Sequence, residues 1–241
     1  MLVLGFDTAT AAVSVALHDG TGVVAEAFAA DARRHGELLA PMIATVMADA
    51  GASRAELTAI AVGVGPGPYT GLRVGVVTAR VLGEVLGIPV HGLCSLDVIA
   101  ADAASTESRE FLVATDARRK EVYWARYDPG AVRVAGPEVG PAAEIPGAAQ
   151  LAVAGAGGLA YPEAFGEVTG PAYPDARTLC AIVAARLSGR PAAADLHPLP
   201  QAARPAPLPQ AARPALLPPE PLYLRRPDAR EPGAPKRVTP R

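Results

Sequence analysis

The 241-residue chain is half apolar and carries 24 acidic against 22 basic side chains, which gives a formal net charge of −2. This length can bury a sizeable core in one large domain or two smaller lobes, and the charge argues against a general nucleic-acid-binding protein, which needs a basic face. No apolar run is long enough to span a bilayer, and no basic segment precedes the first apolar run, so we expect a cytoplasmic protein that does not contact a membrane.

Three strands are expected at the start of the chain, at residues 2–8, 11–18 and 23–28. The first ends in Asp7, in the sequence Asp-Thr-Ala-Thr. In an actin-like ATPase or sugar kinase, an acid at this position holds a metal or orients a phosphate, and the hairpin usually reads Asp-x-Gly-Thr. The acid is present here and the glycine is absent, which leaves two alternatives for Asp7: a catalytic residue, or a turn or cap residue.

A helix is expected to open at residues 33–37 and to end at Gly51. His35, at its start, favours a cap or core neighbour over a metal ligand, because a helical metal site would need a second histidine one turn later and position 39 is leucine. A metal-dependent peptidase is therefore the weakest functional alternative. Cys94 and Cys180 stand alone in apolar surroundings, which predicts buried free thiols.

Residues 62–75, with the sequence VGVGPGPYTGLRVG, form an expected turn from a buried strand at 57–64 into a second helix. Glycine permits close approach of an anion or of a neighbouring chain. The turn lacks the Gly-Lys-Ser/Thr of a phosphate-binding loop, however, and Pro66 and Pro68 remove two backbone N–H donors. The sequence therefore favours a rigid, shaped surface loop over a nucleotide-binding loop. The residues considered for either role are Asp7, Thr8, Gly65, Gly67, Thr70, Gly71, Arg73 and Asp116.

The second helix carries two distinct faces. The apolar face consists of Val74, Val77, Thr78, Val81, Leu82 and Val85. The other face has small residues four apart, at Gly75, Ala79, Gly83 and Gly87. Glycine within a helix costs about 1 kcal/mol relative to alanine, so this ridge indicates close approach of another backbone, either the protein's own sheet or a second subunit.

A further strand is expected at 88–93 and a helix at 96–104, and the polar residues 105–108 mark a lobe boundary. Residues 111–127 then repeat the opening pattern: an apolar strand, an acid (Asp116) at its end, a tight turn and an alternating strand. A strand at 151–156 and a helix at 179–187 follow. A duplicated actin-like fold would produce this repetition, so we expect two lobes, at 1–105 and 106–190.

The composition changes after residue 190. Residues 191–241 hold fourteen of the 25 prolines, a nine-residue tandem repeat (198–206 and 207–215) and a charge balance of +4, which leaves −6 for the body. Proline disfavours regular helix and sheet. We expect a disordered linker at 191–217 that folds onto nothing, with a docking motif for a proline-binding partner as the alternative, and a segment at 218–241 that docks in part through 221–226.

Five motifs together resemble the bacterial TsaB family. They are Asp7 to Thr10, Arg34 to Glu37, Gly63 to Arg73, Asp116 to Arg119 with Val122-Tyr123, and Pro221 to Arg226. The resemblance covers about residues 1–190 and 218–230, and the central turn is its most specific part. The proline repeat departs from the compact C-terminus of the family.

The resemblance implies a cytoplasmic protein with a two-lobe actin-like (ASKHA) fold, an α/β fold with duplicated βββαβα-type lobes. It implies a heterodimer with TsaD, which transfers a threonylcarbamoyl group to the adenosine next to the anticodon of tRNA, and a further partner, TsaE. This chain would be a non-catalytic component of that acyltransferase complex. It would have no metal or cofactor of its own, since ATP or threonylcarbamoyl-adenylate and the metal belong to TsaD, and it would reach tRNA only through the complex. Homodimer formation in isolation stays open. The alternative function is an ATP-dependent phosphotransferase or ATPase that uses Asp7 and Asp116.

In the family, the subunits associate through the two helices of the first lobe, which correspond here to residues 35–50 and 73–86. The broad stripe on the first helix and the small ridge on the second then predict the interface. Its expected residues are His35, Leu38, Leu39, Met42, Val46, Met47, Gly75, Ala79 and Gly83. On this hypothesis, Gly83→Leu, or Met42 or Met47 changed to Glu, blocks assembly without unfolding the lobe.

Overall fold

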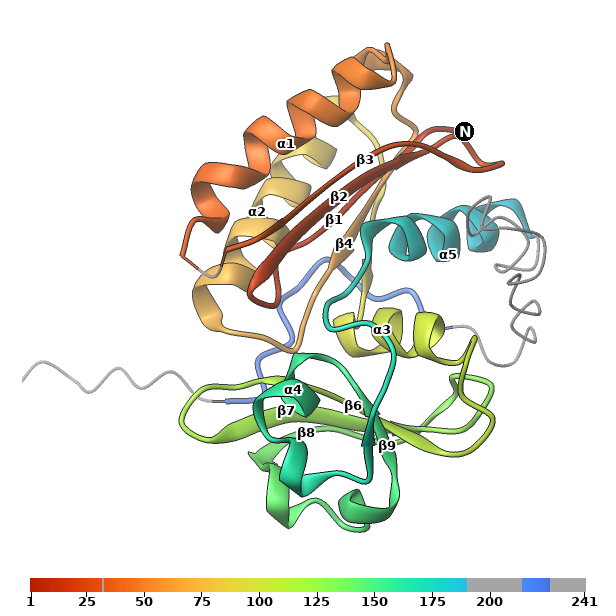
Figure 1. The fold of residues 1–241 in the computed structure, drawn as a ribbon. Coiled ribbons are helices and arrows are strands. Elements are labelled where there is room, and N and C mark those ends of the chain that lie inside the picture. The colour runs from red at the N-terminus through yellow and green to blue at the C-terminus, as the bar shows by residue number, and fades with distance from the viewer. Residues whose placement is uncertain (32, 190–213, 226–241) are drawn as a thin grey trace, which may run out of the picture.

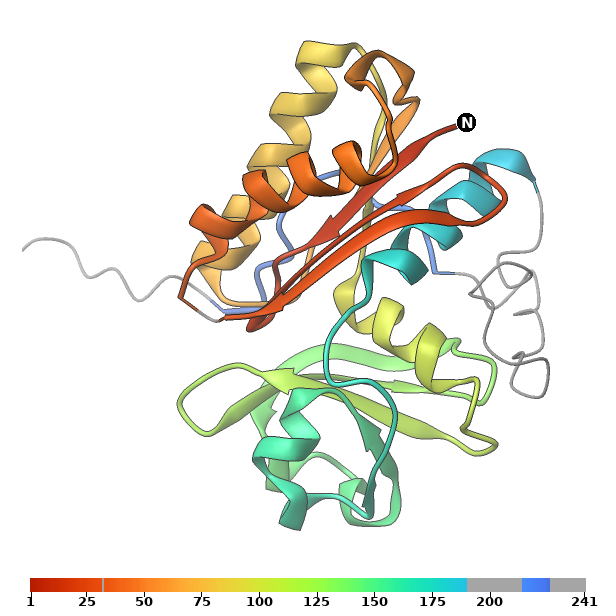
Figure 2. The same ribbon diagram turned by 45° about the horizontal axis from the view of Figure 1, so that its top comes forward.

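The structure, a computed structural model, describes residues 1–31, 33–189 and 214–225. Two five-stranded mixed sheets form the centres of two lobes (Figure 1, Figure 2). The strand order is β3-β2-β1-β4-β5 in the first sheet and β8-β7-β6-β9-β10 in the second, so the chain uses one topology twice. The expected α/β fold of two duplicated lobes is confirmed.

The first sheet begins with an antiparallel meander of β1 (Val3–Asp7), β2 (Ala12–His18) and β3 (Val23–Ala30). The strands β4 (Ala59–Gly63) and β5 (Val90–Leu93) extend it in parallel on the other side of β1. Every residue of β1, β2 and β4 is buried, as expected for strands covered on both faces, whereas the edge strand β3 alternates half-buried and exposed residues.

Helices cover both faces of this sheet. One face carries α1 (His35–Asp49) and α2 (Tyr69–Leu86), which are joined by the short 3₁₀ helix η1 (Arg54–Glu56) and β4. The other face carries α5 (Ala176–Ser188) (Figure 2). The second helix starts at Tyr69 rather than at the expected Arg73, because Pro68 is its N-cap and the next residues already form the first turn.

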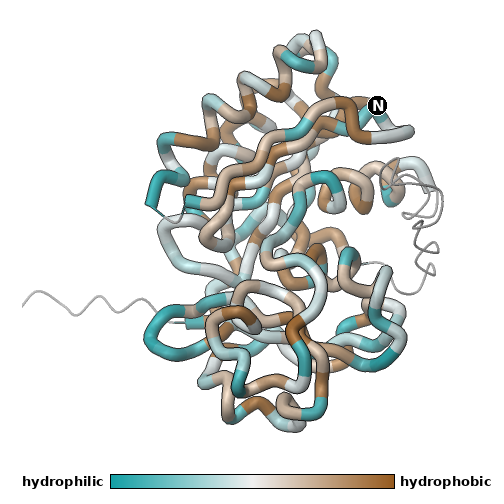
Figure 3. Tube along the Cα trace, in the orientation of Figure 1, coloured by the Kyte–Doolittle hydropathy of each residue, from teal (hydrophilic) through white to brown (hydrophobic). Residues whose placement is uncertain are grey.

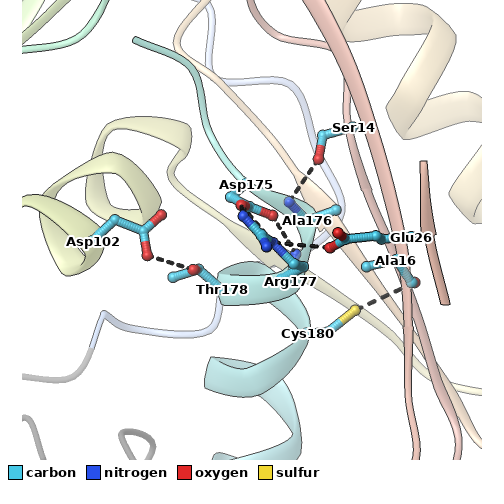
Figure 4. Close-up of polar contacts among 9 residues, drawn as sticks. All are labelled: Ser14, Ala16, Glu26, Asp102, Asp175, Ala176, Arg177, Thr178 and Cys180. Atoms are coloured by element: carbon cyan, nitrogen blue, oxygen red, sulfur yellow. Dashed lines mark hydrogen bonds and ion pairs between the residues drawn. The ribbon is translucent and has the colours of Figure 1, made fainter. Parts of the chain in front are cut away.

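Although α5 lies within the range 106–190 expected for the second lobe, it packs on the first sheet (Figure 4). The backbone N–H of Ala176 donates to Ser14 Oγ on β2 at 2.8 Å, and Thr178 Oγ1 donates to Asp102 Oδ1 at 2.5 Å. Cys180 Sγ lies beneath β1, where a Cβ at Gly5 would collide with it. The chain therefore returns to the first lobe after it has built the second.

The second sheet contains β6 (Phe111–Asp116), β7 (Glu121–Tyr127), β8 (Arg133–Pro141), β9 (Ala152–Ala154) and β10 (Glu167–Val168). The helix α3 (Ser95–Ala103) lies between the two sheets and α4 (Ala156–Ala160) covers the far side of β6 (Figure 1). Three 3₁₀ turns complete the lobe: η2 (Ala142–Glu144), η3 (Ala148–Gln150) and η4 (Pro162–Ala164). The sequence had not indicated β8, β10 or α4.

Residues 214–225 dock along the junction of the lobes. Leu217 and Gly92 exchange two backbone hydrogen bonds of 2.8 Å, the backbone N–H of Leu222 donates to the carbonyl of Val64, and Arg225 donates to the carbonyl of Ala117. The range 191–217 was expected to fold onto nothing, and that expectation is wrong for Pro214, Leu216 and Leu217: the two leucines pack against the hydrophobic core, and the carbonyl of Pro214 accepts a hydrogen bond from Arg186. The rest of the expected linker, up to residue 213, lies outside the described residues.

Two further expectations concern membrane contact and thiols. Within the described residues, no helix is long and apolar enough to cross a bilayer. Cys94 and Cys180 are buried free thiols, as expected, and burial raises the pKa of Cys94 to about 12. Figure 3 shows the apolar residues concentrated in the buried strands and helices, with hydrophilic residues at the outer turns.

Candidate functional site

The central turn packs against the protein's own β1–β2 hairpin. A Cβ at Gly67 would overlap the carbonyl of Ala9, and a Cβ at Gly71 would overlap the carbonyl of Thr8. Thr8 Oγ1 also donates to the carbonyl of Gly71 at 2.7 Å. These glycines thus serve an intramolecular approach. The prediction of a surface loop is wrong for residues 63–67, all of which are buried, and from Tyr69 onward the chain is already helix α2, where Tyr69, Thr70 and Arg73 are exposed.

Asp7 is sealed beneath this turn. Its side chain is 1% exposed, Oδ2 accepts a 2.6 Å hydrogen bond from Ser95 Oγ, and Oδ1 accepts one of 2.7 Å from the backbone N–H of Ala9. Burial raises the pKa of Asp7 to about 6, against the opposing effect of the Ser95 hydrogen bond. Asp7 therefore ties the end of β1 to the start of α3, and this burial counts against a catalytic role.

A cavity of about 280 Å³ lies between the lobes, where the β1–β2 and β6–β7 hairpins meet. It is lined by Thr10, Ala11, Arg33, His35, Gly36, Pro68, Thr70, Gly71, Val74, Thr115, Asp116, Arg118, Ala156 and Tyr173. His35 Nε2 donates to the carbonyl of Thr10 at 2.7 Å, and Asp116 accepts from the backbone N–H of Arg118 at 2.8 Å. Of the residues predicted for a nucleotide site, the cavity brings together Thr70, Gly71 and Asp116. The other five, Asp7, Thr8, Gly65, Gly67 and Arg73, do not line it, although Gly67 lines a second cavity.

A second cavity, of about 300 Å³, lies beside the first. It contains a stacked pair of tyrosines that the sequence did not predict. The rings of Tyr69 and Tyr223 stack there with centroids 5.2 Å apart, and the guanidinium carbon of Arg73 lies 5.1 Å from the Tyr69 centroid. Arg118, Arg119 and Arg225 also line this cavity. Docking of residues 221–226 was expected, but the partner of Tyr223 could not be read from a pattern.

The charged groups of the two cavities are mainly arginines and one carboxylate, Asp116. Within residues 1–31, 33–189 and 214–225, no group of three or more His, Cys, Asp or Glu side chains is placed to hold a metal ion. Asp116 is 3.6 Å from the guanidinium of Arg118, and Asp7 does not reach either cavity. The arginines in the linings offer charged donors to an anion.

The small ridge on α2 packs inward, which corrects its assignment to a subunit interface. Ala79 is fully buried, a Cβ at Gly75 would lie against Thr8 Oγ1, and a Cβ at Gly83 would lie 2.3 Å from Val90 Cγ2. The ridge lets α2 approach β1 and β5 closely, which larger side chains would prevent.

The α1 residues assigned to the interface are also largely internal. Leu39, Val46 and Met47 are buried in the core of the first lobe, while Leu38 and Met42 are half-buried against it. His35 lies at the cavity between the lobes. Three of these six residues are therefore unavailable to a partner.

Instead, α2 exposes three residues of the apolar face that its sequence predicted. Val77, Val81 and Val85 are 50%, 55% and 75% exposed and follow one another at four-residue spacing. We call them the α2 valine stripe. The adjacent α1 also exposes apolar residues, Ala40, Pro41, Ala44 and Ala48, beside the polar Glu37, Thr45 and Asp49. The sheet selects the small ridge because it allows closer packing, so the larger valines face outward.

Comparisons with known proteins place this chain among tRNA-modification relatives. The family model described as "TsaD: tRNA N6-adenosine threonylcarbamoyltransferase" matches residues 12–170. An uncharacterised protein of Mycobacterium tuberculosis is 48% identical over 64% of this chain and 72% of its own length. The tRNA threonylcarbamoyladenosine biosynthesis protein TsaB of Escherichia coli is 39% identical over 53% of this chain and 55% of its own length.

Coverage of the relatives is partial. An uncharacterised protein of Mycobacterium leprae is 49% identical over 64% of this chain, but the match spans only 43% of that relative. Among solved structures, YeaZ from Pseudomonas aeruginosa superposes with a TM-score of 0.66 and 27% identity, over 78% of this chain and 95% of the other.

Proposed function

The chain belongs to the TsaB family, and from that premise we propose that it is a non-catalytic subunit that binds and activates TsaD. The reaction it supports is threonylcarbamoyl transfer to the adenosine next to the anticodon of tRNA. The subunit would act in the cytoplasm as a heterodimer with TsaD, with TsaE as a further partner. The activated threonylcarbamoyl group and the metal would be held by TsaD.

The α2 valine stripe carries this proposal. Three valines in register on one helix, each at least half exposed, are unusual for a monomer surface and are typical of a protein interface. The neighbouring α1 adds four exposed apolar residues, Ala40, Pro41, Ala44 and Ala48. A partner helix could pack between the two helices and bury the stripe. The helices are those implied by the family, but the contacting side chains differ from those expected.

The burial of Asp7 supports the non-catalytic part. A carboxylate that is 1% exposed and hydrogen-bonded to Ser95 reaches neither a nucleotide nor a metal in the adjacent cavity. The alternative, an ATPase or phosphotransferase that uses Asp7 and Asp116, has the cavity between the lobes in its favour and the sealed Asp7 against it.

A reconstituted modification reaction tests the proposal. TsaD, TsaE, unmodified tRNA and chemically prepared threonylcarbamoyl-adenylate are combined with or without this chain, and modified adenosine is measured by mass spectrometry. We expect product only when the chain is present. Equal product without the chain would contradict the proposal. ATP hydrolysis by the purified chain alone, abolished by Asp116→Ala, would establish the alternative.

A further inference from the structure

We propose that the cavity beside the Tyr69–Tyr223 stack is a binding site for single-stranded RNA, in which arginines hold phosphates and the tyrosines stack on a base. The inference deepens the proposed function, on which it rests, because it gives this subunit a direct contact with the RNA substrate. We call this surface the tyrosine–arginine patch, defined by Tyr69, Arg73, residues 118–120, Tyr223 and Arg225.

The patch is basic on an acidic body. Four basic side chains gather there, from Arg73, Arg118, Arg119 and Arg225, and Lys120 follows in the same turn. Two acids lie among them: Asp116 is 3.6 Å from Arg118, and Glu121 forms an ion pair with Arg225. Among the residues that the structure describes, basic side chains therefore outnumber acidic ones at this place, although residues 1–190 carry a balance of −6. Local excess of this kind is the electrostatic footprint of a phosphate backbone.

The tyrosines supply exposed aromatic rings, which a site that binds only phosphate would not need. Tyr69 is 48% exposed and Tyr223 is 43% exposed, and their rings stack at an interplanar angle of 27°. The adjoining cavity of about 300 Å³ is also lined by Tyr123. A pocket at the small end of the usual range, beside an exposed aromatic ring, suits one unstacked base better than a whole cofactor. Every base has a π-face, so such stacking tolerates many sequences.

The turn that presents the basic residues adopts a backbone conformation that side chains disfavour. Arg118, Arg119 and Lys120 have φ values of 62°, 56° and 63°, the left-handed region that glycine or asparagine usually occupies. Hydrogen bonds hold the turn, from the N–H of Arg118 to Asp116 and from the N–H of Ala117 to the carbonyl of Glu121. Figure 3 shows this β6–β7 turn as one of the most hydrophilic in the molecule. Glycine would adopt this conformation with less strain, so three charged residues in its place indicate that their side chains have a function.

An acidic protein surface could also pair with the arginines, but it would leave the exposed rings without a role. Single-stranded RNA satisfies both halves of the patch, through phosphates on the guanidinium groups and a base on the tyrosines. The docked segment 214–225 brings Tyr223 to Tyr69, so the site forms only when this segment has folded back on the body (Figure 1).

The test measures RNA binding by the full chain. The probe is a fluorescein-labelled, unmodified anticodon stem-loop RNA, followed by anisotropy over a range of salt concentrations. Tyr223→Leu removes the ring and keeps an apolar side chain, and we expect it to weaken binding about tenfold, the typical effect of one lost base stack. Tyr223→Phe should bind as wild type. Arg119→Gln should reduce the slope of log affinity against log salt by about 0.7, as for one lost phosphate contact on a single strand.

Two matched variants serve as controls. Phe28→Leu removes an exposed ring on β3, and Arg54→Gln removes an exposed charge in η1, at the other end of β4 from the patch. Both should bind the RNA as wild type. Inorganic polyphosphate should compete poorly, and a DNA of the same sequence more weakly than the RNA.

Wild-type affinity in Tyr223→Leu and Arg119→Gln, or no binding by the wild type, would overturn the inference. So would polyphosphate that competes as well as the RNA, because the patch would then be an anion site only. If these variants keep the RNA but lose TsaD or TsaE, the patch is a protein interface and the inference fails. Association with TsaD is measured separately by co-elution, so failure of the RNA site leaves the proposed function standing.

Discussion

Replacement of Gly83 on α2 by leucine distinguishes internal packing of the small ridge from a role at a subunit interface. A Cβ at this position would lie 2.3 Å from Val90 Cγ2 and 3.1 Å from the carbonyl of Ile88, and ordinary contacts begin at 3.4 Å. Either the Val90 side chain or the helix would therefore have to shift by about 1 Å to accept even alanine, and further to accept leucine.

The free-energy change has two opposing parts. Loss of glycine within a helix stabilises it by about 1 kcal/mol. Overpacking costs about 1–3 kcal/mol for added methylenes, and a gap of 0.5–1 Å along the helix forfeits about a quarter to a half of each contact's dispersion energy. We expect Gly83→Ala to be nearly neutral or to lose about 2 kcal/mol, and Gly83→Leu to lose about 3 kcal/mol, which is about 6–12 °C in Tm for a chain of this size.

Differential scanning calorimetry and co-elution with TsaD provide the assay. Val81→Leu, on the exposed side of the same helix, is the control and should melt within about 2 °C of wild type, since surface changes usually stay within about 0.5 kcal/mol. Gly83→Leu should still associate with TsaD below its melting temperature. If it instead melts as wild type and no longer associates with TsaD, the ridge is the interface and the packing argument is wrong.

Two further predictions follow from buried charges. Because burial raises the pKa of Asp7 from 3.8 to about 6, the folded state holds its proton more tightly, and wild-type stability should fall by up to about 3 kcal/mol as pH rises from about 4 to 6. Asp7→Asn should lack this part of the fall in urea melts at each pH, and an identical pH profile would contradict the assignment. Arg133→Ala should cost about 3 kcal/mol, because it removes the 2.8 Å partner of the Asp97 carboxylate, which is 6% exposed. The lower end of the usual range applies, since Arg133 is 30% exposed. Tyr127 Oη also donates to Asp97 Oδ1 at 2.7 Å, and a loss under about 1 kcal/mol would show that this hydrogen bond is sufficient to stabilise the carboxylate.

Local patterns predicted the architecture well because the same signals occur twice. A strand that ends in an acid, a tight turn and an alternating strand occur at Asp7 and again at Asp116, and the two sheets indeed share one strand order. The helix after the central turn was also predicted, from the spacing of its apolar residues. β8 was not, since Pro137 and Pro141 lower its strand propensity and its pairing with β7 shifts in register.

The main limit of prediction from the sequence was the direction in which each face of a helix points. Four-residue spacing showed that α2 has one small and one larger apolar face, but only the assembled sheet decides which face it accepts. Contacts between distant residues were the second limit. Ser95 seals Asp7 from 88 residues away, and Tyr223 reaches Tyr69 only because residues 214–225 dock. Neither contact leaves a periodic signal in the sequence.

Sedimentation velocity of this chain mixed with TsaD tests the central claim most directly. A heterodimer should form with the wild type and with Val134→Glu, a control whose side chain is 53% exposed on β8 in the second lobe. Val81→Glu, at a site that is 55% exposed, should abolish the complex, because burial would strip a carboxylate of water without providing a partner. If Val81→Glu associates with TsaD as tightly as Val134→Glu does, the α2 valine stripe is not the interface. If the wild type forms no complex with TsaD, the proposed function is wrong.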